Sequence, residues 1–161
     1  MLNLPPQNIR VLSIQFLEAS PEQRLLILKQ LGIARYADFL TQIRLNEVNI
    51  ICMTRFLENP TQLKFPYLVG ADLSDLVLDG VNFIRGNLTR VNLQGSRLVN
   101  ADLIFANFTD ADLRNANVNG ATLNETIWLG TRVENCEFRC TIGLTKVQRQ
   151  DLLKRGAKFH E

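Results

Sequence analysis

The sequence has 161 residues, of which 46% are apolar and 21% are charged, and its formal net charge is +2. This composition supplies enough apolar mass for a globular core, and the charge is too close to zero to indicate binding to nucleic acid or to an anionic membrane. Three cysteines are too few for a disulfide-framed secreted miniprotein, and a single histidine excludes most histidine-dependent catalysis. No apolar run approaches the roughly 20 residues of a membrane helix, which excludes a membrane protein.

The amino-terminal stretch shows no feature of a secretory signal. Residues 1–6 carry neither basic residues nor the start of a cleavable apolar block. Three cysteines in a chain that is not exported indicate reduced thiols rather than disulfides. We therefore expect a cytoplasmic protein without membrane association.

Residues 1–60 are expected to form an α-helical domain, because they show helical apolar spacing and no strand alternation. Ser20 is typical of a helix N-cap, with Pro21 at the first helical position, Gln23 closing a capping box, and Gly32 as a natural stop. A segment around residues 9–17 adds a further helix, so that we expect four. The apolar positions of the other three are Leu25, Leu26, Leu28 and Leu31; Ile33, Tyr36, Phe39, Leu40 and Ile43; and Val48, Ile51, Cys52, Phe56 and Leu57.

Residues 66–140 repeat with a strict period of five. Two places before each large apolar residue lies a mostly small one, with Pro66 and Leu76 as exceptions, and the residue between them is Asp or Asn in eight of fifteen repeats. The fifteen apolar positions are Leu68, Leu73, Leu78, Phe83, Leu88, Leu93, Leu98, Leu103, Phe108, Leu113, Val118, Leu123, Trp128, Val133 and Phe138.

A period of five fits neither a helix nor a continuous strand. On an α-helix five residues turn through about 500°, so the apolar column would wander around the surface. In a strand an odd period places successive members on opposite faces. The pattern instead predicts a three-residue extended piece followed by a two-residue corner, in which the small and the large residue point to the same side. Such a chain coils into a solenoid with stacked inward residues.

The repeat resembles the pentapeptide-repeat family, whose consensus is Ala-(Asp/Asn)-Leu-x-x, and most closely its short cyanobacterial members with helical flanks. The clearest stretch runs from Ala101-Asp102-Leu103 to Ala116-Asn117-Val118. The resemblance implies a mainly β fold, a right-handed quadrilateral β-helix with four repeats per coil. Fifteen repeats would then make just under four coils, about 18 Å tall. We assign this solenoid to residues 61–141.

Residues 142–161 are expected to form a short capping helix and a tail. Thr145 and Gln148 make a second capping-box pattern, and the helix should stop at Gly156. A solenoid leaves open core and unpaired edges at each end, so helices at both ends have a physical role as caps. The basic residues of this segment are explained by solubility and by favourable charge near a helix C-terminus.

Candidate chemical sites have simpler structural explanations. Cys136 falls in the small inward column and Cys140 at an outward corner, so the two thiols should not converge on a metal or form a disulfide. Trp128 falls in the large inward column and should be a core residue. We find no phosphate-binding loop and no zinc spacing, and therefore expect no enzyme, no cofactor and no metal.

Two binding functions follow from these patterns. The first is a non-catalytic protein-interaction or scaffold module, since solenoids offer extended faces. The alternative, implied by the resemblance, is a DNA mimic that binds a type II topoisomerase. Residues 66–140 hold nine acidic and six basic residues, a net charge of −3. A DNA segment 18 Å long would carry about eleven negative charges, so the charge favours the first function.

An apolar cluster marks where a partner would dock. With four repeats per coil, residues twenty apart lie above one another, so Ile84, Ile104 and Phe105 should share an outward face otherwise rich in polar residues. This apolar cluster could be covered by the chain's own helices, by a second copy of the chain or by another protein. We expect no direct contact with nucleic acid. Outward residues on the adjoining face that could extend the cluster are Tyr67, Val69, Ile127 and Leu129.

Overall fold

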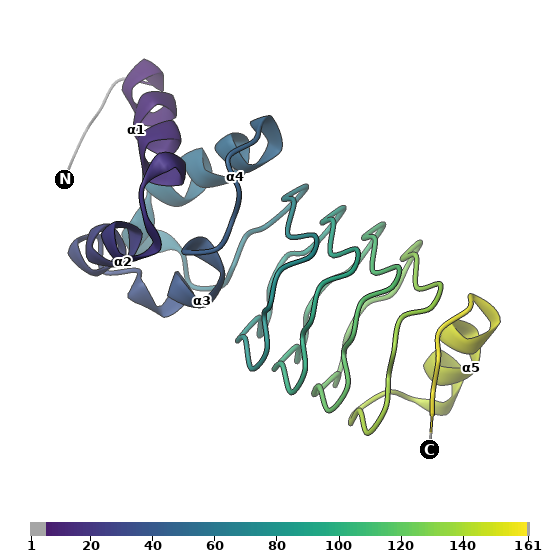
Figure 1. Ribbon diagram of the computed structural model, residues 1–161. Coiled ribbons are helices and arrows are strands. Elements are labelled where there is room, and N and C mark those ends of the chain that lie inside the picture. The colour runs from purple at the N-terminus through teal and green to yellow at the C-terminus, as the bar shows by residue number, and fades with distance from the viewer. Residues whose placement is uncertain (1–5, 161) are drawn as a thin grey trace.

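The computed structural model describes residues 6–160, so the stretch at residues 1–5 inspected for a signal lies outside it. A helical domain is followed by a solenoid, and a last helix lies across the far end (Figure 1). The helical elements are α1 (Pro6–Glu18), α2 (Pro21–Gln30), a 3₁₀ turn (Ala34–Tyr36) that runs into α3 (Ala37–Leu40), α4 (Glu47–Glu58), a 3₁₀ turn (Pro60–Gln62) and α5 (Lys146–Lys154).

Both predicted capping boxes are confirmed. The Ser20 hydroxyl accepts from the backbone N–H of Gln23, whose side chain accepts from the Ser20 N–H. Thr145 and Gln148 repeat this arrangement at the start of α5. Each box satisfies two backbone donors that the first helical turn leaves without a partner.

A buried arginine organises the helical domain. The Arg24 guanidinium donates to the carbonyl oxygens of Leu17, Ala19 (3.0 Å), Leu40 (3.1 Å) and Ile43 (2.7 Å). These carbonyls lie at or just after the ends of α1 and α3, where the helical hydrogen-bond pattern leaves acceptors free. One side chain from α2 therefore joins the ends of both neighbouring helices.

The repeats form a solenoid with four pentapeptides per coil. Parallel bridges join residues twenty apart, from Tyr67 with Asn87 through to Thr122 with Ile142, so the array makes just under four coils. Each side contributes one bridged residue rather than a continuous strand, because a turn interrupts the ladder every five residues. About a third of the chain is helical, and the repeats form isolated bridges rather than strands. The expectation of a mainly β fold is therefore not confirmed for the chain as a whole. The right-handed sense stays a prediction.

The corners have the features of type II β-turns. The second corner residue has a positive φ at all fifteen corners. At thirteen of them the amide of the next repeat's first residue donates to the preceding large residue's carbonyl, as from Ala106 to Leu103 (2.9 Å). This conformation favours Gly, Asn and Asp. At ten corners the second residue is not glycine. These residues are Asp75, Arg85, Arg90, Asn100, Phe105, Asp110, Asn115, Glu125, Asn135 and Cys140.

The inward columns form one buried core that aromatic rings close at both ends. Phe39 of α3 packs edge-on against Phe83, with 5.1 Å between ring centroids. At the other end Phe108 stacks on Trp128 at 4.8 Å, close to the spacing of successive coils. The Trp128 indole N–H donates to the Thr126 hydroxyl (2.7 Å), so Trp128 is the core residue predicted from its column.

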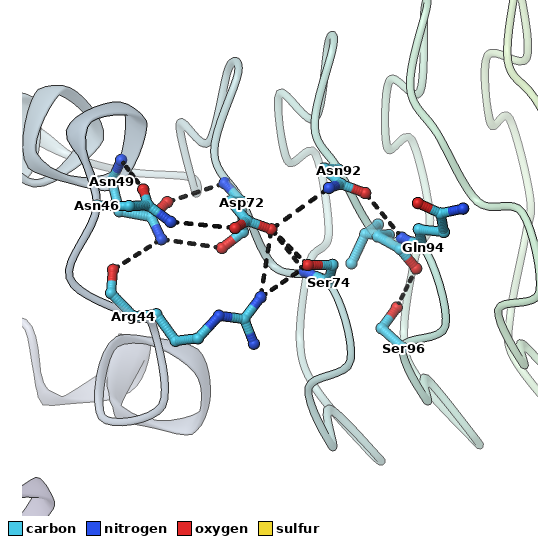
Figure 2. Close-up of polar contacts among 9 residues, drawn as sticks. Arg44, Asn46, Asn49, Asp72, Ser74, Asn92, Gln94 and Ser96 are labelled. Carbon is cyan, nitrogen blue, oxygen red and sulfur yellow. Dashed lines mark hydrogen bonds and ion pairs between the residues drawn. The ribbon is translucent and has the colours of Figure 1, made fainter.

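Side chains of the helical domain replace a missing coil before the first one (Figure 2). Within the ladder, the Asn92 N–H donates to the Ala71 carbonyl (2.9 Å), and the Asn92 carbonyl accepts from the Leu73 N–H (2.8 Å). Asp72 has no earlier coil to bond. The Asn49 carboxamide takes that place, accepting from the Asp72 N–H (2.8 Å) and donating to the Asp72 carbonyl (3.0 Å).

Two further side chains complete this edge. Gln42 donates to the Val77 carbonyl (2.9 Å) and Arg55 to the Val69 carbonyl (3.1 Å). Unpaired strand edges invite aggregation, and these contacts remove acceptors from that edge.

The carboxyl-terminal segment closes the opposite edge. Gln148 donates to the Thr126 carbonyl (3.0 Å), and Arg155 donates to the Thr131 carbonyl (2.9 Å). These carbonyls point toward a coil that does not exist, so α5 satisfies them in its place. Both ends of the solenoid are therefore capped, as we expected from the helical flanks.

Part of the segment that we assigned to a tail continues the solenoid. Residues 157–159, Ala-Lys-Phe, repeat the small-polar-large pattern, and Lys158 bridges Glu137 in parallel. The Lys158 N–H donates to the Cys136 carbonyl (2.8 Å), and Phe159 stacks on Phe138 at 4.9 Å. The period of five did not reveal residues 157–159, because α5 interrupts the repeat. Lys158 therefore follows its bridge partner Glu137 by twenty-one residues rather than by twenty.

Candidate interaction surface

The predicted cluster lies along one edge of the solenoid. Ile84 and Ile104 are first corner residues, are half-buried and follow one another twenty residues apart. Phe105 is the second corner residue and is 47% exposed. The helical domain packs on the end of the solenoid rather than along this edge, so Phe105 stays open to solvent (Figure 1).

Two neighbours outside the predicted apolar cluster complete this surface: Phe65, which the sequence analysis missed, and Arg85, an outward residue of the same face. Phe65, one residue before the array, is 46% exposed. The Arg85 guanidinium carbon lies 5.6 Å from the centroid of the Phe65 ring and 4.8 Å from that of the Phe105 ring. The spacing of twenty that joins Phe65, Arg85 and Phe105 could have revealed the set. We call Phe65, Ile84, Arg85, Ile104 and Phe105 the corner strip.

The edge of the solenoid that carries the corner strip has the least favourable backbone of the array. Arg85, Phe105 and Glu125 have φ values of 55°, 58° and 57°. A left-handed conformation costs residues of this kind roughly 1 kcal/mol or more. On this edge none of the three second corner residues is Gly, Asn or Asp, whereas each of the other three edges has at least two such residues. The other edges are Gly70, Arg90, Asp110 and Gly130; Asp75, Gly95, Asn115 and Asn135; and Gly80, Asn100, Gly120 and Cys140.

Two of the four residues expected to extend the cluster are far from each other in the stack of coils. Tyr67 and Ile127 lie three coils apart on one face, with Asn87 and Asn107 between them. Arg55 contacts both the Tyr67 ring, at 5.3 Å, and the following turn, so that part of the face belongs to the junction with α4. The candidate surface is therefore confined to the corner strip.

The recurring Asp and Asn residues bond the local backbone. In each case a side-chain oxygen accepts from the amide two residues on, over 2.9–3.4 Å, which holds the start of the corner. The eight residues are Asp72, Asn82, Asn87, Asn92, Asp102, Asn107, Asp112 and Asn117.

Several acidic residues of the solenoid are neutralised by arginine. Asp112 pairs with Arg114 (2.7 Å), and Asp79 pairs with Arg97 (2.7 Å). Hydrogen bonds from Arg114 hold the pKa of Asp112 below its ordinary value, against the opposing effect of partial burial. These pairs break up any continuous acidic surface.

The cysteines lie apart. Cys136 is buried and Cys140 is exposed, and burial raises the pKa of the Cys52 thiol to about 12. Across residues 6–160 no three potential ligand side chains come together as a metal site. Within the same range no helix has the length and apolarity to cross a membrane.

Two hollows flank the helical domain. A groove of about 530 Å³ is lined by residues of α1, by the end of α2 and by the segment from the end of α4 into the 3₁₀ turn, including the apolar Ile9, Leu12 and Leu57. A shallower cleft of about 430 Å³ between the helices and the first coil is lined in part by Glu22 and Asp79. Neither hollow adjoins the corner strip.

The repeats also match a known family. The model described as pentapeptide repeats matches residues 61–95 and 87–124, with eight copies. Residues 61–124 of the chain are pentapeptide repeats. The match begins after the helical domain and ends before Trp128, although the bridges of this pentapeptide-repeat protein continue to Ile142. Its last repeats therefore keep the coil after their sequence departs from the consensus.

Solved structures of other pentapeptide repeat proteins are similar to this one. One from the Arabidopsis thaliana thylakoid lumen is 27% identical over 57% of this chain and 79% of its own, with a TM-score of 0.46. One from Nostoc PCC 7120 is 29% identical over 58% and 80%, with a TM-score of 0.31. One from Cyanothece 51142 is 27% identical over 48% and 57%, with a TM-score of 0.33. A search of curated proteins gave no significant match.

Proposed function

We propose that this pentapeptide-repeat protein is a non-catalytic protein-interaction module whose docking surface is the corner strip. The observation that carries the proposal is the coincidence of strain and exposure. Phe105 holds a bulky side chain at a φ of 58° and leaves it 47% exposed. Backbone strain that no core packing requires is commonly retained at functional sites.

The closed ends favour a side of the solenoid as the docking surface. The backbone groups at the first end of the solenoid are bonded by Asn49, Gln42 and Arg55. Those at the last end are bonded by α5 and residues 157–159. An added strand would find these backbone groups already bonded. A partner would instead contact side chains along an edge, which is how solenoids usually bind.

The absence of catalysis, cofactor and metal is part of this proposal. It is supported by the placement of the reactive residues, since Cys52 and Cys136 are buried and the acidic residues serve the turns. The three free thiols support a cytoplasmic location, because disulfides persist in oxidising compartments.

A DNA mimic is the weaker candidate. Mimicry needs regularly spaced uncompensated negative charge. Here arginines pair with Asp79 and Asp112, and Arg44 lies 3.4 Å from Asp72. No surface feature of the solenoid favours that function over a protein-interaction module.

A photo-crosslinker placed at Phe65 tests the docking surface. We expect a discrete protein adduct in cells that is lost when Phe105→Glu is added, because the two rings share one surface. Asn115→Glu is the matched control, since it adds the same charge at a corner with the same backbone conformation. Thermal melting must show that both variants fold as the parent does.

Three outcomes would overturn the proposal. They are no adduct from Phe65, an adduct that survives Phe105→Glu, and a melting temperature lowered by Phe105→Glu but not by Asn115→Glu. The last would show that Phe105 is part of the protein's own core. An adduct with the same chain, together with a dimer mass in light scattering, would identify a second copy as the partner and leave the docking surface in place.

A further inference from the structure

Arg85 presents a preorganised anion-binding edge. Phe65 precedes it and Phe105 follows it along the corner strip, and the guanidinium carbon lies 5.6 Å from the centroid of the Phe65 ring and 4.8 Å from that of the Phe105 ring. Cation–π contacts of this length restrict the position of the planar group. A guanidinium held in this way loses little freedom when it binds a carboxylate with two parallel hydrogen bonds.

The Arg85 side chain has no acidic partner among residues 6–160. Arg97 and Arg114, by contrast, pair with Asp79 and Asp112. Glu125 belongs to the same edge, but Phe105 lies between it and Arg85 in the succession of coils. The donors of Arg85 are therefore available to an external acceptor.

The surroundings of Arg85 select the kind of anion. Lys64, next to Phe65 in the sequence, is exposed and adds a second positive charge, and Ile84 and Ile104 add apolar surface as the first residues of the corners that hold Arg85 and Phe105. The array as a whole carries a net charge of −3, which repels an extended polyanion such as a nucleic acid. A single carboxylate flanked by apolar side chains matches both the charge and the apolar surface.

We infer that the corner strip binds an extended acidic peptide segment of a partner protein, with one Asp or Glu on Arg85 and large apolar residues over Phe65 and Phe105. This inference rests on the proposed function and deepens it by naming the chemistry of the partner. The aromatic rings act twice, since they position the guanidinium and also contact the flanking apolar side chains.

Paired peptide arrays test the inference on the full chain. One array holds hexapeptides with Glu between two residues drawn from Leu, Ile, Phe and Trp, and the other holds the same peptides with Gln in place of Glu. We expect the best Glu peptide to bind at least about tenfold more tightly than its Gln counterpart in fluorescence anisotropy, because the charged hydrogen bonds are lost.

Variants then assign the effect to Arg85. Arg85→Gln should abolish the preference for Glu, and Arg85→Lys should weaken binding about tenfold, because an ammonium group lacks the planar fork. Arg90→Gln is the matched control, since Arg90 has a φ of 56° at the same corner position and no ring stacked on it among residues 6–160. It should leave binding unchanged.

The outcomes separate this inference from the docking surface itself. Equal binding of Glu and Gln peptides that is lost in Phe105→Glu would overturn the acidic chemistry and keep the docking surface. Binding that ignores both Phe105→Glu and Arg85→Gln would overturn both. No binding to either array, or tighter binding to a phosphoserine peptide or to a single-stranded oligonucleotide than to the best Glu peptide, would also overturn the acidic-peptide assignment.

Discussion

The helical domain and the solenoid are stabilised in different ways. The helical domain depends on single contacts that occur once, such as the four carbonyls bonded by Arg24. The solenoid repeats one set of contacts in every pentapeptide, with a buried large residue, a bridge and a turn. We therefore expect that losing one contact in the solenoid destabilises only the neighbouring coils, provided that the inward columns stay apolar. Losing the contacts of Arg24 should destabilise the whole helical domain.

Leu93→Asp should produce the largest effect, because it tests the inward column itself. Leu93 is fully buried in the middle of the stack. An unpaired charge there should lower the free energy of unfolding by about 4 kcal/mol or more, measured by urea denaturation. Gln94→Asp, one residue on at an outward position, is the control and should change it by about 0.5 kcal/mol or less. Similar stability of both variants would contradict the register.

Arg24→Met should destabilise the helical domain more than the solenoid. It leaves the carbonyls of Leu17, Leu40 and Ile43 without their donor in a buried site, at a cost of about 3 kcal/mol. Hydrogen exchange should rise across α1 to α4 while the amides of the central coils stay protected. Arg10→Met, at an exposed ion pair with Glu47, should leave exchange unchanged. Uniform exchange across the chain would show that the two regions unfold as one unit.

Asn49→Leu tests the boundary between the two regions. It removes both hydrogen bonds to the Asp72 backbone and should cost about 2 kcal/mol. The Asp72 amide should then exchange faster, with little change at Asn92 one coil further. Asn49→Asp keeps the size of the side chain and removes the donor, so it should be at least as damaging at neutral pH. Unchanged exchange at Asp72 would show that water replaces the carboxamide without loss.

Acidification should produce the smallest effect and should fall on the solenoid. The pKa of Asp112 lies below its ordinary value of 3.8 in the folded protein, chiefly because Arg114 bonds the carboxylate. This group therefore stabilises the fold fully above that value, and its contribution is lost as the pH falls through the lowered pKa. Asp112→Asn should reduce the loss of melting temperature between pH 5 and pH 3. An identical acid dependence in both proteins would contradict the assignment.

Patterns short enough to be local were predictable. The capping boxes at Ser20 and Thr145 involve four consecutive residues, and the inward columns follow from a period that every repeat restates. The corner strip was predicted in part. Ile84, Ile104 and Phe105 stood out as apolar residues at outward positions, whereas Arg85 is a polar residue where polar residues are expected, and Phe65 precedes the array.

The sequence alone determined the repeat register and the inward columns of the solenoid, because both depend on a strict period. It determined the helical domain only in part. The third expected helix is a 3₁₀ turn followed by the four-residue α3, and Leu26, Val48 and Ile51, which were expected on the apolar faces of helices, are exposed. Only the tertiary structure decided how the solenoid ends and which outward residues meet. Asn49 bonds Asp72 across twenty-three positions, and Lys158 bridges Glu137 after a helical excursion that breaks the period. Such contacts depend on where the chain returns in space, and neither propensity nor periodicity records that return.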